Sequence, residues 1–451
     1  MGLGSIIFIV FLIGAVALFW RNVSKIRRNI MLGREVNRTD RKSERLKTML
    51  RVAFGQSKMV TKPIAGIMHV FIYVGFVIIN IEVLEIILDG ILGTHRVFHA
   101  ALGSFYFVVI DFFEVLALLV VVSVVVFLLR RLVMHIPRFH KKEMKGWPTW
   151  DALNILWIEL VLMAAFLIMN AADAALMQLP AEALADAGLS KYALQLENDF
   201  LISQYLTGIL PQDASALAMI ERTAWWAHIL GILAFLNYLP FSKHFHIILA
   251  FPNTYYSNLE PKGRFTNNEQ VKKEVETMFD PDADPYASPA PEEEQEPIQT
   301  FGAKDVTDLT WKQLMDSYSC TECGRCTAEC PANQTGKLLS PRKIMMDTRD
   351  RLEEVGQNID KNGKDHDDGK SLLNDFITPE ELWACTTCNA CVEACPVNID
   401  PLSIIMEMRR YLVMEESAPP TELNAMFTAV ENNGAPWQFP QADRMKWAEE
   451  D

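Results

Sequence analysis

Five long apolar segments dominate the sequence and limit what the chain can fold into. They cover residues 3–20, 64–88, 102–129, 152–177 and 223–250, and the first is an uncharged run of 18 residues. A helix of about 20 apolar residues spans the hydrocarbon core of a bilayer. We therefore expect five membrane-spanning helices. Because basic residues follow the first segment and do not precede it, we interpret it as a retained helix and not as a cleaved signal peptide.

The loops between these segments differ sharply in basic charge. The loop 21–62 holds 13 Lys and Arg residues and the loop 130–145 holds six, whereas the other two loops hold only Arg96, Lys191 and Arg222. The positive-inside rule places the first two loops in the cytoplasm. With five spans, we then expect the N-terminus outside and everything after residue 250 in the cytoplasm. The predicted location is the inner (cytoplasmic) membrane, as a multi-pass protein.

Charge also divides the chain into two parts. Residues 1–264 hold 25 basic and 19 acidic side chains, a net charge of +6, while residues 265–451 hold 17 and 37, a net charge of −20. The basic charge lies beside apolar segments, so it indicates membrane topology and not nucleic-acid binding. The acidic second part would repel nucleic acid and suits docking to a protein partner.

All eight cysteines lie in two matching motifs of the second part. The motifs read C-x2-C-x2-C-x3-C-P, the run typical of bacterial ferredoxins, and consist of Cys320, Cys323, Cys326 and Cys330, then Cys385, Cys388, Cys391 and Cys395. In such runs the fourth cysteine ligates the other cluster. We therefore predict one 4Fe-4S cluster on Cys320, Cys323, Cys326 and Cys395 and a second on Cys385, Cys388, Cys391 and Cys330. Zinc is the competing metal, but it explains two complete runs ending in proline poorly.

These features predict an all-α protein, a five-helix transmembrane bundle followed by an α-helical ferredoxin domain with two 4Fe-4S clusters. The 54 residues between the cysteine motifs favour a helical domain over the small ferredoxin sandwich. The expected boundaries are a membrane domain at 1–255, an acidic, proline-rich linker at 256–305, the cluster domain at 306–416 and a C-terminal tail at 417–451.

Histidines within the membrane segments are candidate haem ligands. His228 and His246 are 18 residues apart, which is five turns and about 27 Å on one face if the helix is continuous. His69 starts the second span at the depth of His246, so this pair is predicted to ligate one b-type haem. His99, or less favourably His95, would complete a second haem with His228. The alternative is that these are interfacial histidines hydrogen-bonded to headgroups or neighbouring helices.

Acidic residues also occur within the spans. They are Glu82 and Glu85 in the second, Asp111 and Glu114 in the third, and Glu159 in the fourth. A carboxylate in lipid is costly, so these side chains should face the bundle interior or a polar cavity. They indicate either a quinone and proton site or hydrogen bonding between helices. Arg130 and Arg131 are interpreted as interface anchors.

The cysteine stretches at 320–342 and 381–413 resemble the cluster domain of the heterodisulfide reductase C and D subunits, the glycerol-3-phosphate dehydrogenase C subunit and the succinate dehydrogenase iron-sulfur subunit. In the first two groups a cysteine-rich CCG domain often follows or comes from a partner. No cysteines remain here to build one, so the resemblance implies that such chemistry belongs to another subunit.

The five-span part resembles the gamma subunit of respiratory nitrate reductase and the membrane E subunit of heterodisulfide reductase, a cytochrome b-like domain. That resemblance rests on the order of spans and on His228 and His246. In the nitrate reductase family the second span carries two haem histidines ten residues apart, whereas here Ile79 stands ten residues after His69. The second span therefore lacks one of the two haem histidines of that family, which counts against the second haem.

Together these patterns predict an electron-transfer subunit of an oxidoreductase complex, with no complete substrate site of its own. It would relay electrons between a cytoplasmic flavoprotein, such as an electron-transfer flavoprotein or another dehydrogenase, or a CCG-domain partner, and a membrane quinone, by analogy menaquinone. The cofactors would be two 4Fe-4S clusters and one or two haem b. The alternative is a ferredoxin-type docking or redox-sensing module on a haem-free membrane anchor.

Overall fold

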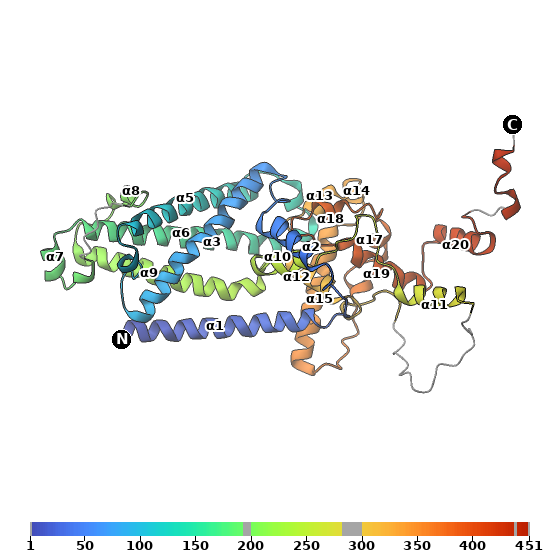
Figure 1. Cartoon of the computed structure of the whole chain (residues 1–451), viewed down its shortest axis with the longest axis horizontal. Helices are drawn as coiled ribbons and strands as arrows, with labels where there is room; N and C mark the ends of the chain where they lie inside the picture. The colour runs from blue at the N-terminus through green and yellow to red at the C-terminus, as the bar shows by residue number, and fades with distance from the viewer. Residues whose placement is uncertain (1, 193–199, 282–299, 437–439, 450–451) are drawn as a thin grey trace.

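The computed structural model describes residues 2–192, 200–281, 300–436 and 440–449, and these are organised almost entirely as helices. Backbone pairing of the strand type occurs within them only as isolated bridges. Figure 1 shows an elongated molecule, with a bundle of long helices at one end and a compact set of shorter helices at the other. The predicted all-α architecture is confirmed.

Five helices are long and apolar enough to cross a bilayer, as the sequence predicts. They are α1 (Leu3–Ile30), α3 (Pro63–Leu92), α5 (Phe105–Leu132), α6 (Trp147–Met177) and α9 (Ala214–Tyr238). At 1.5 Å per residue each reaches beyond the roughly 30 Å of hydrocarbon. In Figure 1 they lie side by side, with α1 along one edge of the bundle. The protein is therefore a membrane protein with a helical bundle.

Local sequence signals set the helix ends. Pro63 opens α3 and Pro148 lies in the first turn of α6, positions where the missing N–H of proline costs no hydrogen bond. Asp213 caps α9, because its side chain accepts a 2.8 Å hydrogen bond from the N–H of Ala216. Gly93 ends α3 in the left-handed conformation, with φ of +76°, which glycine adopts without strain.

The fifth apolar segment is not one continuous helix, and the expectation that His228 and His246 share a helix face is wrong. Helix α9 ends at Tyr238, because Pro240 cannot donate the next helical hydrogen bond. Two 3-10 turns follow, at Leu239–Phe241 and Lys243–Phe245, before helix α10 (His246–Tyr255) begins. The two histidines therefore lie on different helices.

The cysteine-rich domain packs short helices around its own apolar core. Its helices are α12 (Trp311–Ser319), α13 (Arg325–Glu329), α14 (Pro331–Gln334), α15 (Pro341–Asn362), α16 (Leu372–Asp375), α17 (Pro379–Trp383), α18 (Ala390–Ala394) and α19 (Pro401–Met414). Leu314, Ile344, Leu352 and Met408 are completely buried between them. Capping boxes at Thr310 and Thr378 satisfy the first N–H groups of α12 and α17.

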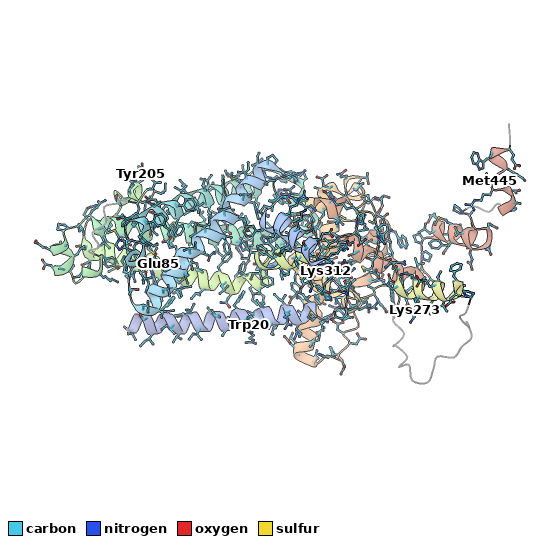
Figure 2. The ribbon with its side chains drawn as sticks, in the orientation of Figure 1. Trp20, Glu85, Tyr205, Lys273, Lys312 and Met445 are labelled. Atoms are coloured by element: carbon cyan, nitrogen blue, oxygen red, sulfur yellow. The ribbon has the colours of Figure 1, made fainter. Side chains whose placement is uncertain are left out.

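Hydrogen bonds join the cluster domain to the membrane bundle. The side-chain amide of Asn29, at the end of α1, donates to the hydroxyl of Tyr318 at 3.0 Å. The ammonium of Lys312 donates to Asn253 of α10, also at 3.0 Å; Lys312 lies at the junction in Figure 2. Arg342 of α15 pairs with Glu143 of the loop 133–146 at 2.6 Å. Both basic loops therefore lie on the same side of the membrane as the clusters.

Helices also occur in the predicted linker and tail. Helix α11 (Glu269–Phe279) lies within the predicted linker, whose residues 282–299 are outside the described residues, and α20 (Thr421–Asn433) lies in the tail. Both extend away from the bundle beyond the cluster domain (Figure 1). The remaining helices are α2 (Lys42–Met49), α4 (His99–Leu102), α7 (Ala181–Asp186) and α8 (Gln204–Thr207), with a π turn at Leu50–Phe54 after α2.

Candidate electron-transfer site

The two cysteine motifs have the same backbone conformation. In the first, Glu322 and Gly324 flank the second cysteine with φ of 54° and 69°; in the second, Thr387 and Asn389 do so with φ of 56° and 60°. Each loop then enters a short helix, α13 or α18, and these two helices pack against each other. A paired left-handed conformation is costly for residues other than glycine. Its repetition indicates that both loops are shaped around the same kind of ligand.

Cysteines of the two motifs lie close enough to influence one another's ionisation. Burial raises the pKa of Cys395 to about 11, and the neighbouring Cys323 contributes to the increase. Burial likewise raises the pKa of Cys326, with Cys320, Cys323 and Cys395 adding to the effect. In the other set, burial raises the pKa of Cys391, as do Asp400, Cys385 and Cys330. The fourth cysteine of each motif thus lies near cysteines of the other motif, as the predicted assignment requires, and Cys391 also lies near Cys326.

The chemistry of this donor set fits iron-sulfur clusters. All eight thiols are free of disulfides. Backbone N–H groups of Thr387 and Ile399 donate to the sulfurs of Cys385 and Cys395 at 3.4 and 3.3 Å, the kind of bond that tunes cluster potentials. Because burial raises the pKa of Cys320 to about 12, its thiolate requires a compensating cation.

No three His, Cys, Asp or Glu side chains converge on a single metal ion in the part of the chain that the structure describes. A zinc site would draw its sulfurs to about 2.3 Å from one ion.

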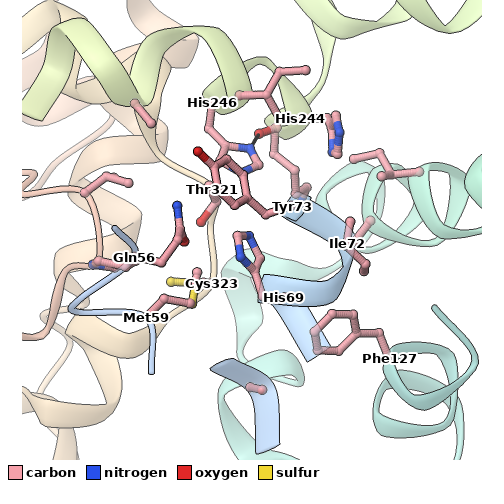
Figure 3. A pocket seen from close by; sticks show the side chains of 18 of the residues that line it. Gln56, Met59, His69, Ile72, Tyr73, Phe127, His244, His246, Thr321 and Cys323 are labelled. Atoms are coloured by element: carbon pink, nitrogen blue, oxygen red, sulfur yellow. Dashed lines mark hydrogen bonds between the residues drawn. The ribbon is translucent and has the colours of Figure 1, made fainter. Parts of the chain in front are cut away.

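A cavity of about 350 Å³ lies where the cluster domain meets the membrane bundle. It is lined by His69, Tyr73, His244 and His246 from the membrane part and by Thr321 and Cys323 from the first cysteine motif. Figure 3 shows the rings of His69 and His246 on facing walls, with Cys323 beside them. The volume falls within the range of pockets that bind small molecules and cofactors.

His69 and His246 are placed as a pair of metal ligands would be. Their ring centres are 6.4 Å apart. Two imidazoles bonded to one metal at about 2.0–2.1 Å would have ring centres roughly 6 Å apart. Nδ1 of His246 lies 3.0 Å from the carbonyl oxygen of Lys243, a bond that leaves Nε2 free toward the cavity. Nδ1 of His69 is buried, with no hydrogen-bond partner in the described part of the chain. Burial lowers the pKa of His246, which favours the neutral, ligating imidazole.

The structure does not bring His228 and His99 together. His228 is buried within α9, and its Nδ1 lies 2.9 Å from the carbonyl oxygen of Leu162. His99 begins α4, where its ring contacts Tyr106 and Phe107 at 5.6 Å. His95, the other partner considered, bonds Asp173 at 3.0 Å. The geometry therefore gives one histidine pair facing a cavity, at His69 and His246.

Positive charge lines the end of the cavity next to the cluster domain. Arg130, Arg131, Arg138, Arg325 and Lys243 all contribute to its wall, and among the described residues Glu159 supplies the only carboxylate of the lining. Nε of Arg138 is buried and has no hydrogen-bond partner within the described ranges. Arg130 and Arg131, interpreted from the sequence as interface anchors, thus face an enclosed space that suits a ligand with carboxylates.

An ion pair connects the cavity to the first cysteine loop. Glu322, between Cys320 and Cys323, accepts hydrogen bonds from Lys243 at 2.5 Å and from Arg349 at 2.8 Å. The backbone carbonyl of Lys243 also bonds the ring of His246. The loop around the first set of cysteines is thereby fixed to the turn that carries His246.

The half of the bundle away from the cluster domain, called the outer half below, holds a network of buried polar side chains; Glu85 marks it in Figure 2. Arg96 donates to Asp173 at 2.5 Å, to the hydroxyl of Tyr106 at 3.0 Å and to Asn170 at 2.9 Å. Tyr106 in turn donates to Glu85 at 2.8 Å. The network joins α3, α5 and α6, so these groups hold helices together.

Most of the predicted membrane carboxylates belong to this network. Glu114 accepts from Asn170 at 3.1 Å and from the N–H of Ile202 at 2.7 Å, and Asp111 accepts from the N–H of Leu201 at 2.9 Å. Glu82 lies among them with one carboxylate oxygen unpartnered. Hydrogen bonding between helices therefore accounts for Glu85 and Glu114, and Asp111 bonds the turn at Leu201, whereas Glu159 faces the cavity instead.

Sequence reasoning missed His244 as a cavity residue. A continuous helix would point it away from His246, but the break at Pro240 turns both rings into the cavity, with centres 5.5 Å apart. The proline itself was the available signal. The same break brings the ammonium of Lys243 to Glu322, a contact that no local pattern in the sequence encodes.

Comparison with known families identifies the cysteine-rich region. A family described as a 4Fe-4S dicluster domain matches residues 319–399, which include both motifs. Residues 319–399 are a 4Fe-4S dicluster domain. The predicted presence of 4Fe-4S clusters is confirmed, while the assignment of individual cysteines to each cluster remains a prediction.

Two curated relatives align with almost the whole chain. One is a probable iron-sulfur-binding oxidoreductase, FadF, of Bacillus subtilis, 28% identical over 99% of this chain and 61% of its own length. The other is the EtfAB:quinone oxidoreductase of Syntrophomonas wolfei, 28% identical over 98% of this chain and 58% of its own length. The chain thus spans about three fifths of the length of these relatives.

A shorter relative matches the dicluster domain more closely. The C subunit of a ferredoxin/F(420)H(2)-dependent CoB-CoM heterodisulfide reductase of Methanosarcina acetivorans is 35% identical over 25% of this chain and 56% of its own length. The predicted resemblance to iron-sulfur oxidoreductases of the heterodisulfide reductase kind is confirmed. No solved structure matches the chain.

Proposed function

We propose that this chain relays electrons between a soluble redox partner and a quinone in the membrane, through two 4Fe-4S clusters and a b-type haem. The observation that carries the proposal is the cavity in which His69 and His246 face each other at 6.4 Å while Cys323 of the first cluster motif lines the same wall. A haem bound in this cavity and clusters bound by the cysteines would supply one-electron carriers. The residues around them hold, orient and shield these groups.

The two sets of cysteines give the relay an order. Cys323 of the first set borders the cavity, so this set is the one nearer the membrane. Cys388 of the second set is exposed to solvent. Electrons would therefore pass between the partner and the second set at the surface, and between the first set and the haem at the cavity. Glu322 and Lys243 fix the distance across this last gap.

The charges of the cavity support haem as its occupant. A b-type haem has two propionates, and the cluster-side end of the cavity offers Arg130, Arg131 and Arg138 within a mostly apolar wall. Arg138 has a buried N–H group with no partner among the residues that the structure describes. Arginine forms strong charge-assisted bonds to carboxylates, so these side chains would bind the propionates and orient the ring.

The proposed partner is an electron-transfer flavoprotein or a subunit that carries a CCG domain. The name of the Syntrophomonas relative links EtfAB to a quinone, which supports the first choice. We propose that the partner lies in the cytoplasm, together with the dicluster domain. The excess of basic residues in the two loops beside that domain supports this orientation.

The decisive experiment removes the proposed haem ligands one at a time. His69→Ala and His246→Ala should each abolish the Soret and alpha absorption bands of a b-type haem in the purified protein, while the EPR signals of both clusters remain. Electron flow from the clusters to a quinone should then be lost. His366→Ala, at an exposed histidine of the dicluster domain, is the matched control and should leave all signals unchanged.

A protein with both clusters, no haem bands and unchanged electron flow in the two variants would instead be a haem-free anchor for a docking or redox-sensing module. Purification of the intact complex and identification of its flavoprotein or CCG-domain partner tests the partner separately.

A further inference from the structure

The cavity has two ends of different character, and they lie at different depths. Its wall follows α3 from His69 to Val77, a rise of about 12 Å along the helix axis. The arginines and Cys323 mark the end next to the dicluster domain. Phe76 and Val77, deeper along α3, line the cavity together with Glu159. Only the first end has the charge that a propionate requires, so the second suits a different, largely apolar ligand.

Two polar side chains stand in this second part of the cavity without a good hydrogen bond to any other described side chain. Glu159 of α6 is mostly buried, and its carboxylate comes no closer than 3.7 Å to Nε2 of His244, too far for a good hydrogen bond. The imidazole of His244 also lines the cavity, and a neutral imidazole offers one donor and one acceptor. Burying a carboxyl group and a neutral imidazole without hydrogen bonds costs free energy, unless a ligand forms hydrogen bonds with them.

The same part of the cavity reaches the lipid. Phe76 and Val77 line it, and 42% and 49% of their surfaces are exposed. At this point of α3 the cavity is therefore not closed off by buried side chains. A ligand that is dissolved in the bilayer could enter between these residues without passing through water.

We propose that Glu159 and His244 bind the head group of a quinone that enters from the lipid beside Phe76 and Val77. A quinone ring is flat and apolar with two carbonyl oxygens, and a quinol has two hydroxyl groups; a donor and an acceptor on one apolar wall match both forms. This assignment rests on the proposed function, because it names the site of the quinone that completes the relay. Figure 3 shows His244 facing the cavity beside His246, which places the head group next to the haem ligands.

The test measures binding of menadione, a naphthoquinone without a lipid tail, to the full-length protein in detergent. Glu159→Leu and His244→Leu should each weaken binding about tenfold or more, the effect of losing one strong hydrogen bond. Glu159→Gln keeps a donor and an acceptor at the same place and should restore binding to within about threefold of the original value. A role in packing alone would make Leu the better replacement.

Glu82→Leu is the matched control, since Glu82 is also a buried carboxylate of the bundle but lies outside the cavity. If Glu82→Leu weakens menadione binding and Glu159→Leu does not, the quinone site lies in the outer network and the proposal is wrong. If haem is present but all of these variants bind menadione equally, the relay stands and this site fails. If haem is absent from the original protein, it is the proposed function that fails.

The path from the lipid is tested separately, with menaquinone in phospholipid vesicles. Val77→Trp should slow the reduction of menaquinone at least several-fold while menadione binding in detergent changes little. Ile81→Trp, one turn further along the lipid-facing side of α3 and 51% exposed, should have no effect. Equal rates in both variants would exclude entry beside Val77.

Discussion

The two halves of the membrane bundle differ in how far their buried polar side chains are hydrogen-bonded to other side chains. In the outer half, Arg96, Asp173, Asn170 and Tyr106 bond to one another and the network closes around Glu85 and Glu114; one oxygen of Glu82 is the exception, without a partner among the described residues. In the inner half, Nδ1 of His69 and Nε of Arg138 are buried without a partner among the described residues, and both side chains border the cavity with Glu159. Figure 2 marks Glu85 in the first half and Lys312 close to the second.

This difference distinguishes buried polar side chains that stabilise the fold from those that are available to bind a ligand. A polar side chain in lipid is retained either because another side chain satisfies it or because a ligand does. The outer network therefore stabilises the bundle, whereas the inner groups are available for cofactor and substrate. Substitutions that remove charge should consequently affect stability in one half and ligands in the other.

The largest expected effect is on the stability of the outer half. Arg96→Leu removes the guanidinium that pairs with the buried carboxylate of Asp173, leaving it with His95 alone, and should lower the free energy of unfolding by about 3–5 kcal/mol. Thermal unfolding in detergent measures the change. Glu159→Leu is the contrast, because replacing this carboxyl group breaks no good hydrogen bond to a described side chain, so the unfolding midpoint should stay equal or rise. Equal destabilisation by both substitutions would remove the distinction between the two halves.

A second prediction concerns the ion pair at the cavity. A negative charge beside a cluster disfavours its reduction, so Glu322→Gln should raise the midpoint potential of the cluster next to Cys320. The expected shift is on the order of 60 mV, a tenfold change for a one-electron couple. EPR-monitored redox titration measures both clusters separately. Glu329→Gln, an exposed acid immediately before Cys330, is the control and should shift neither potential by more than a fraction of this amount.

The smallest expected effect is on the retention of haem in the inner half. Arg138→Leu removes one of the arginines at the cluster-side end of the cavity and should weaken haem retention roughly three- to tenfold, since one charge-assisted bond is lost. Absorbance during transfer of haem to apomyoglobin measures the loss. Lys145→Leu, at an exposed lysine of the same loop, should release haem at the original rate. Unchanged retention in Arg138→Leu would show that its buried N–H group serves another ligand.

The sequence alone was sufficient to predict the features that depend on residues close together in the chain. Apolar runs of bilayer length predicted the five spans, although their ends moved, and α6 begins five residues before the expected Ala152. The repeated cysteine spacing predicted the dicluster domain, because a short loop around one cluster needs its ligands close together in sequence. Helical periodicity failed at Pro240, where it was extended through a residue that ends the helix.

Local order therefore determined which segments are able to cross the membrane and which region carries the iron-sulfur motifs. Only the tertiary structure decided that His69, His244, Glu159 and Cys323 border one cavity, since they come from four separate elements. It also decided which of the predicted carboxylates join the outer network and which one faces the cavity. The physical reason is that a side chain in lipid is satisfied or left unpaired by neighbours far away in the sequence, and the packing of the helices brings those neighbours together.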